Sequence, residues 1–267
     1  MGETATRTFS GIVYIVLLTF AVFYSPITFL LLFGFFLATA IVEFCKLVNL
    51  KPIVPLIIGM ASYSVFNFFP SSPQTEIFLL LAALFVLIKC MLGLLVTGKR
   101  LVDSTSKYVE LIGYLIIPFL LLTKIPFYAD RYEPKIIMSI FVLIWVNDTF
   151  AFIVGKAIGQ TKLFERISPK KTVEGFIGGL GFAALTGLLL ARFYLIESFY
   201  IWTFIAVIVS IFGTIGDLVE SKFKRDAGVK DSGNIMPGHG GILDRLDSVI
   251  FAAPFVFLFY QILNYVS

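Results

Sequence analysis

The chain has 267 residues, of which 58% are hydrophobic and only 14% are charged, with a mean hydropathy of +0.95 and a formal net charge of +4. This composition excludes an ordinary water-soluble domain, because its apolar runs are long enough to cross the hydrocarbon core of a bilayer. The runs do not alternate apolar and polar residues, as strands of a membrane β-barrel do. We therefore expect an all-α integral membrane protein that forms a single domain over residues 1–267.

Nine apolar segments predict nine transmembrane helices, separated by turn-rich or polar connectors. They cover approximately residues 8–24, 27–47, 52–69, 77–96, 108–122, 136–158, 176–193, 199–218 and 242–265. The first segment is interpreted as a retained helix, since no small-residue cleavage site follows it. Cys45 and Cys90 both lie inside apolar runs, which favours buried apolar side chains over a disulfide or a metal pair.

The distribution of Lys and Arg predicts the orientation of the chain. With a cytoplasmic N-terminus, 16 of the 21 basic residues lie in cytoplasmic segments and four in outer loops, while Lys89 lies within a span. Cytoplasmic loops of membrane proteins carry such an excess, so we expect the N-terminus inside and the C-terminus outside. Two charged loops, residues 159–175 and 218–241, then face the cytoplasm, where nucleotides are available. Residues 1–135 are interpreted as scaffold helices and residues 136–267 as the catalytic part.

Residues 217–247 concentrate ionisable groups in an otherwise apolar chain. Aspartates, glutamates, lysines and arginines alternate there with five glycines, and the segment holds the only histidine, His239. Carboxylates bind hard cations, Lys and Arg bind phosphate, and glycine lets the backbone approach a ligand closely. The segment therefore predicts metal-assisted chemistry on a phosphate compound.

Asp148 is a carboxylate inside the apolar segment 136–158. A charge at that depth is costly unless it faces a cavity, a cation or a partner. One interpretation is a structural ion pair with Lys89 or another buried cation. The other is a metal or substrate ligand on the cytoplasmic half of the helix.

Three further aspartates flank the second charged loop. Asp217 ends one predicted helix, and Asp244 and Asp247 share a face of the next because they are three residues apart, with Arg245 on another face. A single acid in a first helical turn is explained by the helix dipole. Two on one face beside Asp217 and Asp148 would repel one another without a cation, so we favour a divalent metal site.

The glycine-rich sequence P-G-H-G-G at residues 237–241 directly precedes the last predicted helix. Free N–H groups at a helix start bind phosphate, although glycine-rich loops are also common there without a ligand. His239 is equally well interpreted as a polar loop residue or as a functional one.

A second motif, S-P-K-K-T-V-E-G, occupies residues 168–175. It predicts a loop followed by a helix with Thr172 as its N-cap and Glu174 in its first turn. Lys170 and Lys171 would neutralise nucleotide or lipid phosphate, or would only anchor the loop to anionic lipid. Their spacing does not decide between these roles.

Three segments together resemble the signature of the CDP-diacylglycerol synthase (phosphatidate cytidylyltransferase) family. They are N-D-T-F-A-F-I-V-G, S-P-K-K-T-V-E-G, and the run S-K-F-K-R-D-A-G-V-K-D followed by P-G-H-G-G-I-L-D-R-L-D. The matching residues of the long run are Ser221, Lys224, Arg225, Lys230, Asp231, His239, Gly240, Gly241, Asp244, Arg245 and Asp247. Met236 departs from the Leu, Ile or Phe more usual there, and the first five helices match only in hydropathy.

The resemblance implies transfer of a cytidylyl group from CTP to phosphatidate in a multi-pass cell membrane, with the site facing the cytoplasm. It also implies dependence on Mg²⁺ and a homodimer, with no nucleic-acid partner. Such transfer needs positioning and charge neutralisation, which a metal ion and Lys/Arg side chains supply. The attacking lipid phosphate is already an anion, so His239 is not required as a strong base.

Roles within the signature follow as hypotheses. Asp217 and Asp244 are the best candidate metal ligands, followed by Asp148, Asp247 and then Asp231, and four acids leave room for a second cation of unknown identity. The residues assigned to nucleotide or lipid phosphate are Lys170, Lys171, Ser221, Lys224, Arg225, Lys230, Gly240, Gly241 and Arg245. A cavity open to lipid between helices is expected, because the lipid must enter from the inner leaflet.

Two other classes of function remain open at this stage. A CTP-dependent polyprenol kinase would transfer the γ-phosphate and release CDP, and a relative acting on archaeal ether lipids would share the cytidylyl chemistry. A transporter would use intramembrane acids to line a pathway. The clustering of charge at one membrane face and the lack of an inverted repeat or paired broken helices disfavour transport.

Overall fold

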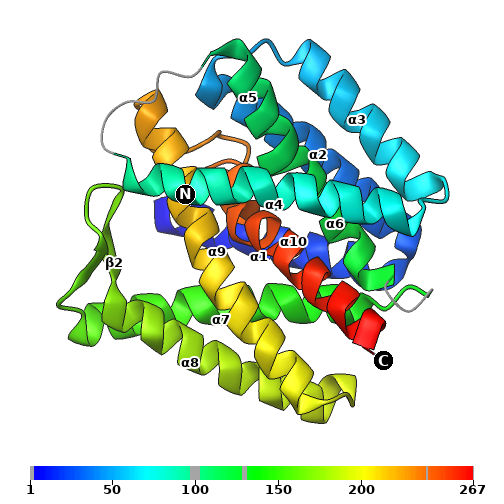
Figure 1. The fold of residues 1–267 in the computed structure, drawn as a ribbon. Helices are drawn as coiled ribbons and strands as arrows, with labels where there is room; N and C mark the ends of the chain where they lie inside the picture. The colour runs from blue at the N-terminus through cyan, green and yellow to red at the C-terminus, as the bar shows by residue number, and fades with distance from the viewer. Residues whose placement is uncertain (1–2, 97–102, 128–130, 239, 267) are drawn as a thin grey trace.

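The computed structural model describes residues 3–96, 103–127, 131–238 and 240–266 (Figure 1). Its elements are α1 (Glu3–Tyr24), α2 (Pro26–Val48), α3 (Ile53–Phe68), α4 (Pro73–Leu95), α5 (Ser104–Glu110), η1 (Leu111–Ile116), α6 (Ile117–Lys124), η2 (Ile125–Phe127), α7 (Pro134–Ile158), β1 (Lys162–Phe164), β2 (Ser168–Thr172), α8 (Val173–Leu190), η3 (Ala191–Leu195), α9 (Phe199–Ala227) and α10 (Leu243–Val266).

The predicted all-α membrane architecture is confirmed. Each of the nine predicted segments is helical within the described ranges, and eight of them are long and apolar enough to cross a membrane. The remaining helix, α3, has 16 residues, which at 1.5 Å per residue gives about 24 Å. That is shorter than the hydrocarbon core of about 30 Å. A ninth span therefore stays a prediction, as does the orientation of the termini.

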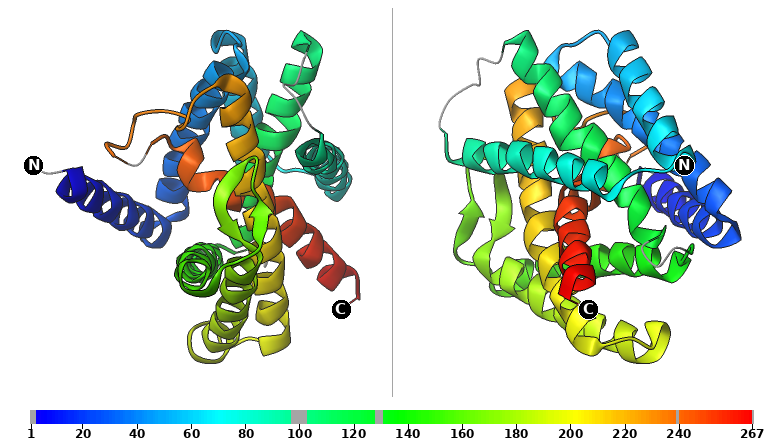
Figure 2. Two further views of the ribbon diagram at one scale, coloured as in Figure 1. Left: turned by 90° about the vertical axis from the view of Figure 1, so that its left-hand side faces the viewer. Right: turned by 45° about the vertical axis from the view of Figure 1, so that its right-hand side comes forward.

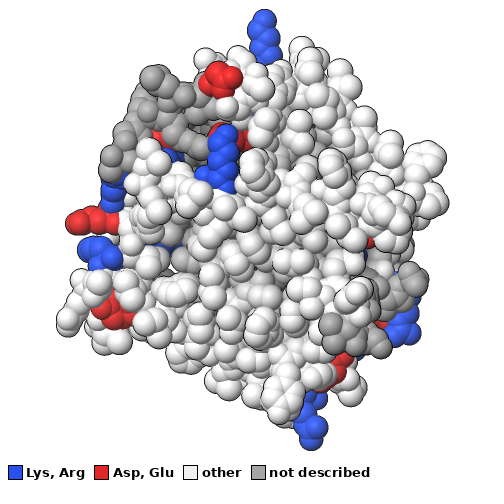
Figure 3. All heavy atoms as spheres, in the orientation of Figure 1, with Lys and Arg blue, Asp and Glu red and all other residues white. Residues whose placement is uncertain are grey.

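The surface of the molecule carries many large apolar side chains. Phe78, Phe85 and Phe152 are examples, each about 70% exposed, whereas a water-soluble protein rarely exposes broad apolar patches. Figure 3 shows a face that is largely free of charge, with Lys, Arg, Asp and Glu confined mainly to its margins. Cys45 and Cys90 are both free and buried, as predicted. These features are those of helices surrounded by lipid.

The predicted boundary at Leu218 is wrong, because α9 continues to Ala227 and ends at Gly228 with a positive φ of 75°. The last turns of α9 are polar rather than apolar, but they remain helical. Ser221 donates to Asp217 one turn earlier, and side chains at this spacing lie next to each other on a helix. The loop predicted at residues 218–241 therefore begins ten residues later than expected.

The other predicted loop, residues 159–175, contains the antiparallel hairpin of β1 and β2. The predicted start of the following helix is confirmed, since the Thr172 side chain accepts a hydrogen bond from the Gly175 N–H at 3.1 Å and caps α8. Glu174 lies in the first turn, and its carboxylate accepts hydrogen bonds from the N–H groups of Gln160 and Thr161. These contacts close the base of the hairpin and hold β2 beside α7.

The second half of the chain forms a tightly packed helical group. α8 packs against both α7 and α9, and α10 packs against α9. Figure 2 shows the hairpin beside this group and α1 at the edge of the molecule. Glycines permit the close approach of α7 and α8. A Cβ atom at Gly179 would lie 2.6 Å from the Asn147 carbonyl oxygen, directly before Asp148 in α7.

We predict that Gly179→Ala lowers the free energy of unfolding by about 1–3 kcal/mol, because the new methyl group forces α7 and α8 apart. Gly181→Ala on the same helix is the matched control. Apart from the adjacent backbone of α8, no heavy atom would lie within 4 Å of a Cβ atom at Gly181, so this variant gains helix propensity without a clash. Thermal unfolding in detergent would separate the two variants. Equal unfolding temperatures would contradict the role of Gly179 in packing.

Candidate active site

A cavity of about 420 Å³ lies where α7, β2, α9 and α10 meet. Of the predicted site residues, it is lined by Asp148, Lys170, Lys171, Asp217, Lys224, Asp231, Asp244, Arg245 and Asp247. These residues come from three separate stretches of the sequence. The fold therefore brings the three motif segments to one place.

Three carboxylates form a cluster beside this cavity. Oxygen atoms of Asp217, Glu220 and Asp247 all lie within 4.8 Å of one another. Asp217 and Glu220 are three residues apart on α9, and Asp247 faces them from α10. Like charges this close repel strongly in a protein interior unless cations lie among them.

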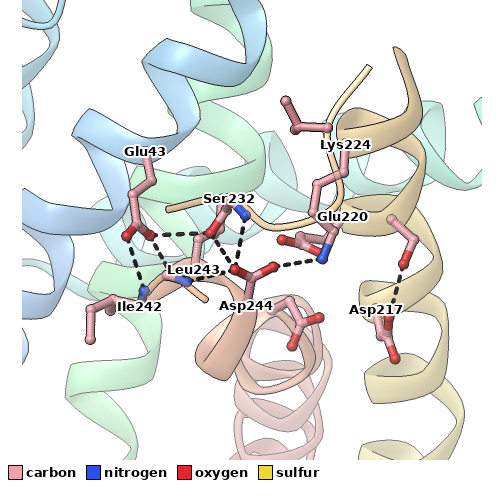
Figure 4. A network of polar contacts seen from close by, with 12 residues as sticks. Glu43, Asp217, Glu220, Lys224, Ser232, Ile242, Leu243 and Asp244 are labelled. Carbon is pink, nitrogen blue, oxygen red and sulfur yellow. Dashed lines mark hydrogen bonds and ion pairs between the residues drawn. The ribbon is translucent and has the colours of Figure 1, made fainter. Parts of the chain in front are cut away.

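Two lysines supply positive charge to the cluster. The Lys171 Nζ lies 2.6 Å from the Asp217 Oδ2, and Lys224 forms an ion pair with the fully buried Glu220 (Figure 4). Lys171 comes from β2, so this ion pair ties the hairpin to α9. The nucleotide-binding lysines expected from the sequence are therefore in direct contact with the acids.

Asp244 is held by four hydrogen-bond donors (Figure 4). Its Oδ1 accepts from the Lys224 Nζ at 2.6 Å. Its Oδ2 accepts from the Ser232 N–H at 2.9 Å, the Ser232 hydroxyl at 2.8 Å and the Gly241 N–H at 2.7 Å. Asp244 thus fixes the loop at the start of α10. From the sequence, Asp244 and Asp217 are the best candidate metal ligands. In the structure, both oxygens of Asp244 accept hydrogen bonds from protein donors, and Glu220 joins Asp217 in the cluster instead.

Asp148 lines the cavity from α7 and is accessible through it. Its Oδ1 accepts a long hydrogen bond of 3.4 Å from the Asn147 side chain. The alternative of an ion pair with Lys89 is wrong, because the Lys89 Nζ lies 4.0 Å from Glu110 in another part of the molecule. Asp148 therefore belongs with the acids of the cavity.

The charges around the cavity fit a divalent cation. Its lining contains Asp148, Asp217, Asp231, Asp244 and Asp247, together with Lys170, Lys171, Lys224 and Arg245. Glu220 adds a sixth carboxylate from behind Lys224. With all groups ionised, the acids exceed the four cationic groups by two charges. Oxygen ligands with this excess charge are the kind of site that hard divalent cations prefer.

A second cavity of about 420 Å³ adjoins the first and shares Asp148, Asp244, Arg245 and Asp247 with it. Its other walls come mainly from α1 and α7 and include apolar side chains such as Ile15, Ile144 and Trp145. Arg245 was predicted to point away from the two aspartates. It lines both cavities because the first turn of α10 lies between them.

The other predicted binding residues lie around the loop before α10. Lys230, Asp231, Gly240 and Arg245 line a third cavity of about 490 Å³ together with Arg7 of α1. The Ser10 hydroxyl of α1 donates to the Pro237 carbonyl at 3.0 Å, which joins this loop to α1.

Three predicted residues stand apart from these cavities. Arg225 is exposed at the end of α9, where it donates to the Val229 carbonyl at 3.4 Å rather than lining the first cavity. Ser221 touches the site only through its hydrogen bond to Asp217. His239 lies outside the described residues.

Two acids contribute to this region that the sequence did not predict, Glu220 in the carboxylate cluster and Glu43 at the start of α10. Glu220 carried a signal, since it is three residues after Asp217 and four before Lys224. Because the predicted helix ends at Leu218, Glu220 falls in the predicted loop, where this spacing does not indicate a shared helix face. Glu43 of α2 is buried, and its carboxylate accepts hydrogen bonds from the N–H groups of Ile242 and Leu243. No local pattern connects Glu43 with a segment about 200 residues later.

Comparison with known proteins shows the family of the chain. The model of the Cytidylyltransferase family matches residues 5–263. The phosphatidate cytidylyltransferase of Bacillus subtilis (strain 168) is 33% identical over 271 residues, which cover 96% of this chain and 97% of that protein. Those of Staphylococcus haemolyticus (strain JCSC1435) and Staphylococcus aureus (strain COL) are 50% identical over 131 residues, covering 48% of this chain and only half the length of each relative. With a family match across nearly all of its length, the chain belongs to the cytidylyltransferase family.

Proposed function

We propose that the protein transfers the cytidylyl group of CTP to phosphatidate, which gives CDP-diacylglycerol and pyrophosphate for phospholipid synthesis. The observation that carries the proposal is the meeting of two cavities at one set of carboxylates. One cavity has lysines for an anionic, water-soluble substrate, and the other has apolar walls for a lipid. The names of the relatives support the same reaction.

The cavity with the lysines would receive CTP. Lys170, Lys171 and Lys224 line it, and lysine ammonium groups neutralise phosphate as compact point charges. Lys171 and Lys224 are paired with carboxylates, so the triphosphate would compete with those acids for the same cations. Arg245 lies at the junction of the two cavities, where it can orient a phosphate of either substrate.

The cavity between α1 and α7 would receive the phosphatidate head group. Ile15 of α1 is 45% exposed and lines this cavity with Ile144 and Trp145. A lipid could pass along these apolar side chains without leaving the hydrocarbon region. Its phosphate would then reach Arg245 and the acids Asp148 and Asp247.

The reaction joins the two substrates by in-line displacement. A phosphate oxygen of phosphatidate attacks the α-phosphorus of CTP, and the bond from that phosphorus to the bridging oxygen breaks as its electron pair leaves with pyrophosphate. We propose that Asp217, Glu220 and Asp247, with Asp148 beside them, would hold Mg²⁺. The ion would neutralise charge on the phosphates in the transition state. The lysines and Arg245 hold the substrates in line, and no residue has to remove a proton from the attacking oxygen.

We retain the cytoplasmic location of the site and the homodimer as parts of the proposal. The first rests on the distribution of basic residues and on the availability of CTP inside the cell. The second rests on the family resemblance. Accessibility labelling of intact cells and mass measurement in detergent would test them separately.

The direct test supplies phosphatidate and CTP labelled at the α-phosphate to the purified protein in detergent–lipid micelles, with and without Mg²⁺. Labelled lipid and released pyrophosphate, both dependent on the metal, are expected. Labelling of lipid only from γ-labelled CTP, with release of CDP, would instead identify a kinase. An intact protein that labels no lipid acceptor would overturn the proposal and leave transport to be tested.

We predict that Ile15→Trp raises the KM for phosphatidate by about tenfold, because the larger side chain narrows the lipid cavity. A small misfit in an apolar pocket weakens binding by about 1–3 kcal/mol, and a change of about tenfold lies at the lower end of this range. The KM for CTP should change by less than about twofold, since CTP uses the other cavity. Ile12→Trp is the control, because Ile12 is exposed on the same helix but is not part of the cavity lining. Equal effects of the two variants would argue against this entry path.

A further inference from the structure

Glu43 is a buried acid of α2 that contacts the start of α10. Among the residues labelled in Figure 4, it bonds no basic side chain. Its side chain is 2% exposed. Oε1 accepts from the Ile242 N–H at 3.1 Å, and Oε2 accepts from the Leu243 N–H at 2.8 Å. Figure 4 shows both bonds reaching from α2 to the residue before α10 and to its first residue. Glu43 therefore acts as an N-terminal cap supplied by another helix.

The position favours a negative charge for two physical reasons. The first N–H groups of a helix have no partners within the helix and need acceptors. The N-terminus also carries the positive end of the helix dipole, which attracts a carboxylate. α10 begins at Leu243, and Asp244 and Asp247 lie within its first two turns. Glu43 thus fixes the turn from which two site carboxylates project.

Glycines provide the space that Glu43 occupies. A Cβ atom at Gly233 would lie 2.3 Å from its Oε1, and one at Gly241 would lie 2.5 Å from both of its carboxylate oxygens. The glycines of the charged loop are therefore needed here for the close approach of a side chain. Phosphate binding, which the sequence suggested for Gly241, is not required to explain this glycine.

A chain of polar contacts links Glu43 to the metal-binding carboxylates. The Ser232 hydroxyl lies 3.3 Å from the Glu43 Oε2 and 2.8 Å from the Asp244 Oδ2. Asp244 binds Lys224, and Lys224 pairs with Glu220 of the acid cluster. Each link is buried or nearly so, and low solvent access strengthens such hydrogen bonds.

We infer that Glu43 is a positioning residue of the active site, and that it sets the orientation of Asp244 and Asp247 through the start of α10 and through Ser232. The inference rests on the proposed cytidylyl transfer. From the sequence, residues 1–135 are interpreted as scaffold helices. With Glu43, this part of the chain would also position active-site residues. Glu43 itself does not touch substrate.

The test compares Glu43→Ala, Glu43→Gln and wild type by kcat, by the KM for phosphatidate and by hydrogen exchange of the Ile242 and Leu243 amides. We expect Glu43→Ala to lower kcat by about 100-fold, as a displacement of about 1 Å in the reacting groups does. The KM for phosphatidate should change much less than kcat, because the apolar walls of the lipid cavity come mainly from α1 and α7 rather than from the start of α10. Glu43→Gln keeps one acceptor oxygen, so its kcat should be about tenfold higher than that of Glu43→Ala. Exchange of the two amides should be faster in both variants.

Glu110→Gln is the matched control, since Glu110 is also buried in the N-terminal half, at 1% exposure, but lies beside Lys89 and not among the contacts described for Glu43. It should leave kcat and the exchange of the two amides unchanged. A kcat of Glu43→Ala within about threefold of wild type would overturn the inference, and so would unchanged amide exchange. If the alanine variant does not fold, the same comparisons on Glu43→Gln decide. A wild-type protein without transferase activity would refute the proposed function, while the exchange data would still test the cap.

Discussion

Asp217→Asn is expected to lower kcat by about three orders of magnitude while the protein stays folded. Asp217 belongs to the three-carboxylate cluster and also binds Lys171 at 2.6 Å. Its loss would remove one ligand charge from the proposed metal site. Charge stabilisation by a bound metal contributes several kcal/mol to a transition state, and about 4 kcal/mol corresponds to this change in rate. The measurement is the rate of lipid labelling from α-labelled CTP as a function of Mg²⁺ concentration.

Asp226→Asn provides the control for this prediction. Asp226 lies on the same helix, nine residues later, and pairs with Lys222 at 3.7 Å, away from the cluster. The same chemical change there should leave kcat within about twofold of wild type. A folded Asp217→Asn variant with wild-type turnover would refute the metal assignment.

Lys224→Met is expected to lower the free energy of unfolding by about 3–5 kcal/mol, because it leaves buried acids without their cation. Lys224 is 12% exposed and pairs with both Glu220 and Asp244. Turnover should also fall, since Asp244 would lose one of its four hydrogen-bond donors and the cavity would lose a lysine proposed to bind CTP. Thermal or denaturant unfolding in detergent would measure the stability change. Lys222→Met should cost less, since its partner Asp226 is more exposed, at 23%.

A double variant separates the charge effect from the loss of packing. Glu220→Gln in the Lys224→Met background removes one of the uncompensated acids, so the double variant should be more stable than Lys224→Met alone. Such non-additivity is the expected sign of a direct interaction between two residues. A double variant that is less stable than Lys224→Met would show that burial of the charge is not what destabilises the single variant.

The sequence by itself determined the class of the protein and predicted where along the chain its candidate site residues lie. The apolar runs predicted helices, because a segment can cross hydrocarbon only when its backbone hydrogen bonds are satisfied within the protein. Charges within such a chain are costly, so their concentration at residues 217–247 and at Asp148 predicted a functional site, and the structure places many of these residues around one cavity. The N-cap at Thr172 was predictable for a local reason, since its bond to Gly175 spans three residues.

Only the tertiary structure decided how these groups share their roles. Whether an acid binds a metal or a protein donor depends on neighbours that are distant in sequence, and Asp244 proved to be held by Ser232 and Lys224 as well as by its own helix start. Glu220 entered the cluster because α9 continues beyond its apolar part. Glu43 lies about 200 residues from the amides that it caps. Pairing over such a separation has no periodicity in sequence, because it is fixed by the packing of α2 against α10.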